Sequence, residues 1–103
     1  MPKAPKKLAV ALGGNAISSP DSQGTIEEQF AQTKQTATQL GAAIAAGHQL
    51  ILTHGNGPQV GNVLRRVEIA RTELYPIPLE VCVADTQAGM GYMIAQCLTN
   101  DLH

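Results

Sequence analysis

The chain has few of the residue types that build nucleic-acid or membrane surfaces. Only 3% of its 103 residues are aromatic, too few to form the stacking platforms that bind single-stranded nucleic acid. Its formal net charge of −1 also argues against nucleic acid and anionic membranes, which recruit basic surfaces. No apolar run approaches the ~20 residues that a membrane-spanning helix needs. We therefore expect neither nucleic acid nor a membrane as a partner.

Cysteine is also scarce. Cys82 and Cys97 are the only two, and they do not form a Cys-x-x-Cys pair. This usage predicts buried thiols in a reducing cytoplasm rather than a disulfide or a metal site, and we expect no metal ligands. The apolar run at residues 8–12 is too short for the core of a signal peptide and stops at glycines. Together these features predict a cytoplasmic protein.

The length of the chain allows at most one domain. Residues 1–7, with Lys3, Lys6 and Lys7, are expected to form a disordered basic arm, and residues 8–103 to form the folded part. Residues 8–12 are apolar throughout, which predicts a strand covered on both faces. A loop is expected at residues 18–24, around Pro20.

The rest of the chain is predicted to form helices and one further strand. Thr25 and Glu28 form a capping-box pattern, and Gly47 can close the helix that follows them. The expected apolar stripe of this helix consists of Ile26, Phe30, Ala37, Leu40 and Ile44. Residues 49–53 predict a second strand and hence a parallel βαβ unit. Two more helices are expected at about residues 58–71 and 79–98, separated by the proline-containing stretch 75–78.

Two glycine-bearing loops follow the two predicted strands, at residues 12–16 and 53–61. Glycine lets the backbone approach a phosphate closely, and N–H groups at a helix start favour negative charge. The common nucleotide signatures fail on spacing. No glycine precedes a lysine as a P-loop requires, and Gly55, Gly57 and Gly61 are one residue too far apart for the dinucleotide fingerprint. The loops thus predict a phosphoryl-binding pocket of another type.

Each of these features also has a purely structural interpretation. Gly13 and Gly14 can form a tight turn, and His54 is more often a hydrogen-bonded structural histidine than a base. Residues 85–87 can be an ordinary polar turn of the last helix. Tyr92 and Met93 are expected to pack in the core or at a dimer interface.

The two loops and the last helix closely resemble the carbamate kinases of the amino-acid kinase superfamily. The resemblance covers about residues 8–98 and is carried by Ala11-Leu12-Gly13-Gly14-Asn15-Ala16, by His54-Gly55-Asn56-Gly57-Pro58-Gln59-Val60-Gly61, and by Pro78-Leu79 leading into Thr86-Gln87 and Gly91-Tyr92. Ala88-Gly89-Met90-Gly91 departs from the more frequent Gly-x-Ile-Gly of the family.

The resemblance implies an α/β fold, a three-layer αβα sandwich with parallel strands, of which this chain holds only the N-terminal part. It implies a cytoplasmic homodimer that transfers a phosphoryl group reversibly between ATP and carbamate, in the catabolism of arginine and carbamoyl phosphate. Gly13, Gly14 and Asn15 would be catalytic, with Gly13 and Gly14 also binding the terminal phosphates of ATP or ADP. The substrate-binding residues would be Gly55, Asn56 and Gly57, which would face carbamate or carbamoyl phosphate.

The family supplies its catalytic lysines and its magnesium and adenine contacts from later sequence. None of the seven Lys and Arg residues here matches such a lysine, so we expect the nucleotide and Mg2+ to be bound mainly by sequence that is not present. The chain alone is then expected to be inactive, and the lack of a charged or disordered tail at residues 98–103 favours a truncated sequence. The alternatives are a truncated anion-binding module without catalysis and an interaction fragment that associates with itself or with a full-length kinase subunit.

Overall fold

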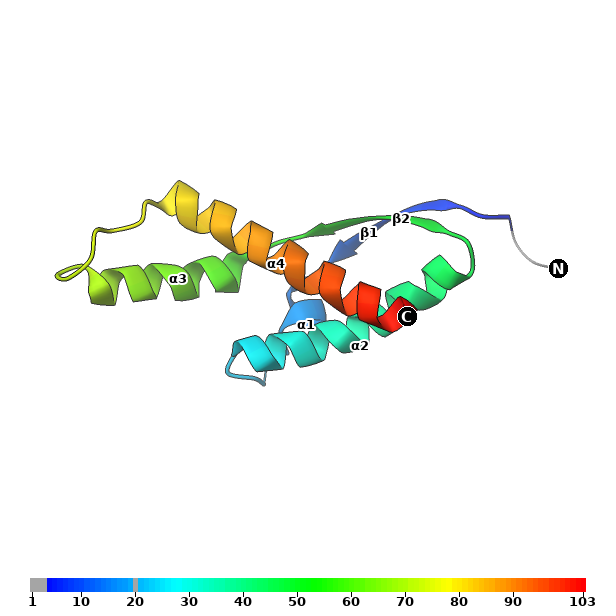
Figure 1. The fold of residues 1–103 in the computed structure, drawn as a ribbon, viewed down its shortest axis with the longest axis horizontal. Coiled ribbons are helices and arrows are strands. Elements are labelled where there is room, and N and C mark those ends of the chain that lie inside the picture. Colours follow the sequence, from blue (N-terminus) through cyan, green and yellow to red (C-terminus); the bar gives the residue numbers. More distant parts are fainter. Residues whose placement is uncertain (1–3, 20) are drawn as a thin grey trace. The chain divides into compact units, whose positions relative to one another are not determined.

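The computed structural model describes residues 4–19 and 21–103. In chain order its elements are β1 (Lys7–Leu12), α1 (Gly14–Ile17), α2 (Ile26–Ala45), β2 (Gln49–His54), α3 (Gly57–Ala70) and α4 (Leu79–Leu102) (Figure 1). The chain forms two compact units. The first contains the chain up to Gly55 together with Met93–His103, and the second contains Asn56–Tyr92. The final helix therefore contributes its beginning to one unit and its end to the other.

The expected N-terminal arm and first loop fall only partly within the described residues. Residues 1–3, with Lys3, and Pro20 lie outside them. Within the described part of the arm, Lys7 is the first residue of β1. The Lys6 N–H donates to Nδ1 of His48 at 3.1 Å, and its carbonyl accepts from the Gln49 N–H at 2.9 Å. Lys6 thus already lies alongside the beginning of β2.

The two strands form the predicted parallel pair. Their register runs from Lys7 opposite Gln49 to Leu12 opposite His54, and Figure 1 shows them side by side. Side chains alternate along β1, so that Leu8 and Val10 are half-buried and Leu12 is buried, whereas Ala9 and Ala11 are exposed. The expectation that the first strand is covered on both faces is therefore wrong for this chain. A right-handed βαβ crossover places its helix on one face of the sheet only.

The helix α2 begins with the predicted capping box. The Glu28 N–H donates to Oγ1 of Thr25 at 3.2 Å, and the Thr25 N–H donates to Oε1 of Glu28 at 3.3 Å. Gly47 follows the helix with a φ of +95°, the left-handed conformation that favours glycine and ends many helices. Both ends of α2 are thus determined by local sequence, as predicted.

The buried face of α2 differs from the predicted apolar stripe. It consists of Gln29, Thr33, Ala37, Leu40 and Gly41, whereas Ile26 is 62% exposed. Polar side chains can lie on this face because they find partners there. Oγ1 of Thr33 donates to Sδ of Met93 at 3.4 Å, and Nε2 of Gln29 donates to the Gly24 carbonyl at 2.8 Å. Tertiary partners, rather than hydrophobicity alone, select which face of α2 is covered.

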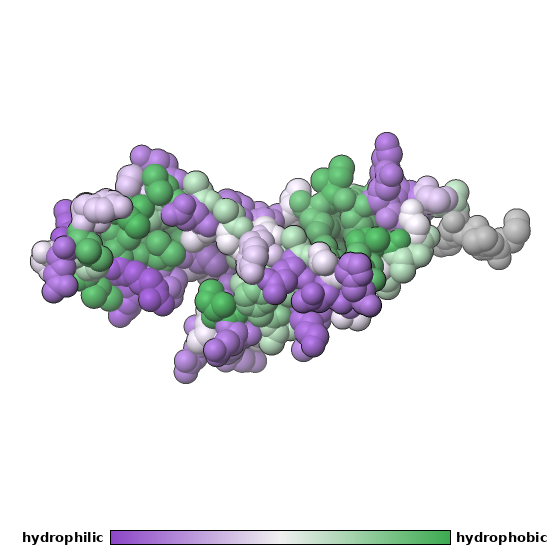
Figure 2. Space-filling view, viewed as in Figure 1, coloured by the Kyte–Doolittle hydropathy of each residue, from purple (hydrophilic) through white to green (hydrophobic). Residues whose placement is uncertain are grey.

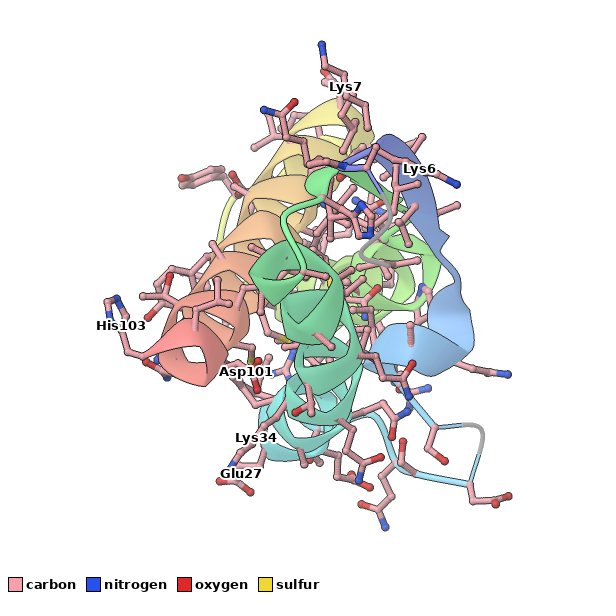
Figure 3. The ribbon with its side chains drawn as sticks, turned by 90° about the vertical axis from the view of Figure 1, so that its right-hand side faces the viewer. Lys6, Lys7, Glu27, Lys34, Asp101 and His103 are labelled. Atoms are coloured by element: carbon pink, nitrogen blue, oxygen red, sulfur yellow. The ribbon has the colours of Figure 1, made fainter. Side chains whose placement is uncertain are left out.

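The core of the first unit lies between α2, α1 and the end of α4. Its buried apolar residues are Leu12, Ile17, Ala37, Leu40, Met93, Ile94 and Cys97. Gly41, in the middle of α2, is explained by Asp101 of α4, because a Cβ at this glycine would overlap Oδ2 of Asp101. Oδ1 of the same carboxylate accepts from Oγ1 of Thr38 at 3.1 Å. Figure 3 shows Asp101 on the side of α4 that faces α2.

The second unit is a helical hairpin made of α3 and the beginning of α4. Pro58 stands at the start of α3, and the segment with Pro76 and Pro78 separates the two helices, as predicted. Cys82 and Met90 are buried. Many other apolar side chains are exposed, and Figure 2 shows hydrophobic surface over this hairpin. They include Ile69, Leu74, Tyr75, Leu79, Val83 and Tyr92. Tyr92 and Met93 were both expected to pack in the core or at a dimer interface. Met93 is buried in the core, whereas Tyr92 is 66% exposed.

Among the described residues, no helix combines the length and the apolar character required to cross a membrane.

Candidate functional site

Both glycine loops leave the sheet from the same edge. Leu12 and His54 are paired in the parallel ladder, and Gly13 and Gly55 are the residues that follow them. The carboxyl ends of parallel strands are where open α/β sheets bind their ligands. The first unit thus brings Gly13, Gly14 and Asn15 to the same sheet edge as Gly55. Asn56 and Gly57 continue the second loop in the other unit.

The first loop turns directly into a short helix. Gly13 has an extended backbone, with φ −76° and ψ 174°, and it precedes α1 as its N-cap. The Ala16 N–H donates to the Gly13 carbonyl at 3.0 Å, and the Ser18 N–H donates to the Gly14 carbonyl at 2.8 Å. The N–H groups of a first helical turn have no acceptor within the helix. Gly14 and Asn15, both exposed, are in that turn.

Within the described residues, neither backbone conformation nor packing requires glycine in the two loops. Among the described residues, positive φ values occur only at Gly24 and Gly47. A Cβ added at any of the loop glycines would meet no atom within 4 Å; these are Gly13, Gly14, Gly55 and Gly57. Glycine at such positions still permits a close approach of something outside the described chain to the backbone. A bound anion is one group that benefits from such an approach.

Two side chains of α2 hold α1 behind the first loop. Nε2 of Gln32 donates to the Asn15 carbonyl at 2.9 Å, and Oγ1 of Thr36 donates to the Ala16 carbonyl at 2.6 Å. Sequence reasoning missed both residues. They lie four positions apart on one helical face, but nothing in their spacing indicates that a segment some twenty residues earlier needs hydrogen bonds.

The second loop is held by α4. Asn56 is the N-cap of α3, yet its side chain makes no capping hydrogen bond. Its Nδ2 instead donates to Oγ1 of Thr86 at 2.7 Å and to the Val83 carbonyl at 3.1 Å. Oγ1 of Thr86 donates to the Cys82 carbonyl at 2.7 Å. Thr86, which could have been an ordinary polar position of the last helix, therefore has a defined partner in the loop.

His54 is half-buried at the end of β2. Its Nδ1 lies 3.2 Å from the carbonyl oxygen of Gly55. This neighbour is part of the same loop, so the contact accords with a structural histidine that shapes the turn.

The two thiols do not contribute to the site. Cys82 and Cys97 are free and buried. Burial raises the pKa of the Cys97 thiol, with a smaller opposing effect of the Lys34 charge, and a raised pKa leaves less of the reactive thiolate at neutral pH. Within residues 4–19 and 21–103, no three His, Cys, Asp or Glu side chains are grouped so as to hold a metal ion.

Comparison with known proteins identifies the class. The profile of the Amino acid kinase family matches residues 6–100, which is most of the chain. The chain belongs to the amino acid kinase family.

Within this family the chain is similar to carbamate kinases. It is 46% identical over 99 residues to carbamate kinase 1 of Enterococcus faecium, an alignment that covers 95% of this chain and 31% of that protein. It is 40% identical over 101 residues to the carbamate kinase of Pyrococcus horikoshii, covering 95% of this chain and 32% of the relative. The chain thus spans about a third of the length of these curated relatives.

A solved structure agrees with the sequence relationship. The carbamate kinase from Giardia lamblia bound to AMP-PNP superposes with a TM-score of 0.89 at 35% sequence identity, covering 94% of this chain and 34% of that one. The expected fold, an α/β arrangement with parallel strands that corresponds to the N-terminal part of a carbamate kinase, is confirmed.

Proposed function

We propose that this chain provides the phosphoryl-binding edge of a carbamate kinase, an enzyme that transfers a phosphoryl group reversibly between ATP and carbamate. The observation that carries the proposal is the pair of glycine loops at one sheet edge, whose glycines neither backbone conformation nor packing requires among the described residues. The kinship with carbamate kinases supports the identity of the substrates. The AMP-PNP bound to the Giardia relative supports an adenine nucleotide as the phosphoryl donor.

In this proposal the two loops have separate tasks. The backbone N–H groups at Gly13, Gly14 and Asn15 bind the transferring phosphoryl group and the terminal phosphates of ATP or ADP. Gly55, Asn56 and Gly57 lie on the side of carbamate or carbamoyl phosphate. Phosphoryl transfer depends mainly on positioning and on stabilising the charge of the phosphoryl oxygens. Fixed N–H donors provide both without reorganising during the reaction.

The proposal assigns no reaction step to a magnesium ion within this chain. Mg2+, the adenine contacts and the charge-stabilising lysines belong to sequence beyond these residues. A cytoplasmic homodimer that works in the catabolism of arginine and carbamoyl phosphate is the setting we propose. The chain alone is then without turnover.

The test uses a hybrid enzyme in which residues 6–100 replace the matching segment of the Enterococcus faecium carbamate kinase. We expect the hybrid to form ATP from ADP, Mg2+ and carbamoyl phosphate, and the separate 103-residue chain to form none above background. Failure of a correctly folded hybrid to form ATP would contradict the function.

Gly14→Val in the hybrid tests the first loop. A side chain there would occupy the space proposed for the phosphoryl group and displace it from its N–H donors, and the loss of one such donor lowers kcat about 100- to 1,000-fold. Gly89→Val is the matched control, because Gly89 is also a helical glycine whose Cβ would meet no atom within 4 Å. We expect the first variant to lose activity by at least this factor and the second to keep activity near that of the parent, at equal secondary structure. Unchanged activity of Gly14→Val would refute the assignment.

The same hybrid distinguishes a carbamate kinase from the second candidate function. A non-catalytic anion-binding module is favoured only by the open loop glycines, and it predicts phosphate binding by the hybrid without ATP formation.

A further inference from the structure

The side chain of Asn56 is used inside the protein rather than offered to a ligand. An asparagine at the N-cap normally accepts a hydrogen bond from the N–H groups of its own helix, but Asn56 makes no such bond. Its amide nitrogen has two protons, and two acceptors on α4 receive them, Oγ1 of Thr86 and the Val83 carbonyl. The amide nitrogen therefore has no proton left to donate to a substrate.

Thr86 is well placed to hold Asn56 in position. Its hydroxyl donates to the Cys82 carbonyl at 2.7 Å while its oxygen accepts from Asn56 at the same distance. Cys82 is fully buried, so the hydroxyl is oriented from a packed turn of α4. Thr86 itself is half-buried, which reduces the competition of water for the bond to Asn56.

We infer that Thr86 is a positioning residue for the second glycine loop and acts through the side-chain amide of Asn56. Gly57 has no side chain with which to anchor itself, and open space surrounds the position of its Cβ. The hydrogen bond from Asn56 to Thr86 of α4 fixes Asn56 between Gly55 and Gly57. It thereby fixes the direction of the backbone N–H groups beside Asn56. The effect on turnover rests on the proposed function, whereas the effect on the loop does not.

A threonine hydroxyl that bonds the carbonyl four residues earlier is a common feature of helices, so Thr86 could serve only the hairpin of α3 and α4. The two roles differ in what a substitution changes. A role in the hairpin predicts lower stability with an unaltered loop in the folded molecules. Positioning predicts an altered loop that a second hydroxyl-bearing residue restores.

The first experiment compares Thr86→Val, Thr86→Ser and Thr99→Val in the 103-residue chain by 15N NMR without ligand. Thr99 is exposed on the same helix and controls for the loss of a hydroxyl. We expect Thr86→Val to shift the side-chain amide signals of Asn56 and the backbone signals of Gly55 and Gly57, and to accelerate their hydrogen exchange. Thr86→Ser should resemble the parent, and Thr99→Val should leave the loop signals unchanged. Loop signals that do not respond to Thr86→Val would overturn the inference.

Asn56→Ala removes the donor of the same hydrogen bond, so the test of the inference does not depend on the folding of Thr86→Val alone. We expect its Gly57 signal to move in the same direction as in Thr86→Val, and the double variant to add little. Independent, additive changes would contradict a shared hydrogen bond.

The second experiment measures turnover in the hybrid enzyme. From the usual net contribution of one hydrogen bond, converted at a factor of ten per 1.4 kcal/mol, we expect Thr86→Val to raise the KM for carbamoyl phosphate about 2- to 12-fold. The KM for ADP should change less than about twofold on the same scale, and Thr86→Ser should restore the parent values. Equal changes in both KM values would refute an effect confined to the acceptor loop. A parent hybrid without turnover would refute the proposed function, while the NMR comparison would still decide the role of Thr86.

Discussion

The close approach of α2 and α4 at Gly41 allows one packing prediction to be worked out quantitatively. In a helix interior alanine is favoured over glycine by about 0.8–1.0 kcal/mol, so Gly41→Ala should stabilise α2 if nothing opposed it. The added Cβ would instead overlap Oδ2 of Asp101 and lie 3.3 Å from its Cγ. The carboxylate must therefore move, and its hydrogen bond to Thr38 must break.

The sizes of these opposing contributions decide whether Gly41→Ala stabilises or destabilises the protein. Loss of the hydrogen bond costs about 0.5–1.5 kcal/mol, and an unfavourable Asp101 rotamer adds about 0.5–1.5 kcal/mol. Against the helical gain, Gly41→Ala should be destabilising by about 0–2 kcal/mol. In an Asp101→Ala background both penalties are already absent, and the same substitution should stabilise by about 1 kcal/mol. The predicted coupling between the two sites is thus about 1–3 kcal/mol.

The assay is urea unfolding of the parent, the two single variants and the double variant, followed by helical circular dichroism. With a slope of about 1–3 kcal/mol per M of urea, a change of 1 kcal/mol moves the midpoint by about 0.3–1 M. Ala42→Gly, next to Gly41 but exposed, provides the matched control and should cost about 1 kcal/mol in both backgrounds. Equal stabilisation by Gly41→Ala with and without Asp101 would refute the reasoning, since Asp101 would then not occupy the space beside Gly41.

Two further predictions concern α2. Hydrogen bonds from the Thr25 N–H, and then from the Thr25 hydroxyl, hold the pKa of Glu28 below its ordinary value of 4.5. Its carboxylate therefore stabilises the fold fully above that value, and the contribution is lost as the pH falls through the lower folded pKa. The difference in urea midpoint between the parent and Glu28→Gln should be largest at neutral pH and vanish in acid, and a difference that grows in acid would contradict this. Thr36→Val should lower stability by about 1–3 kcal/mol because it leaves the Ala16 carbonyl without its donor, and Thr36→Ser should restore it; equal effects of the two substitutions would show that the hydroxyl bond is unimportant.

Local signals in the sequence predicted the elements well. The capping box at Thr25, the positive φ at Gly47 and the proline-containing break before α4 are all determined by residues within a few positions of one another. The parallel pairing of β1 and β2 followed from the helix between them. The short helix α1 was not predicted as a separate element, since a single turn has no hydrophobic period to detect.

Predictions that depend on tertiary partners were less successful. The buried face of α2 includes Gln29 and Thr33, whose polar groups donate hydrogen bonds to the Gly24 carbonyl and to Sδ of Met93. Residues 8–12 are apolar throughout and indicated a strand with two covered faces, but Ala9 and Ala11 are exposed. Apolar composition indicates which surfaces of an element can be buried. Which of these surfaces are buried depends on the packing partners that the rest of this chain provides.

The residues that hold the two loops were also not predicted from the sequence, and they hold the loops in a similar way. Gln32 and Thr36 bind the carbonyls of Asn15 and Ala16, and Thr86 binds the side chain of Asn56. None of these bonds uses the backbone N–H groups of the loop glycines. A binding site for an anion needs its N–H donors fixed but not consumed, and anchoring through carbonyls and a side-chain amide meets both requirements. In the proposed function the glycine motifs indicate where a phosphoryl group approaches, while the two loops are held by polar residues of helices that no loop motif contains.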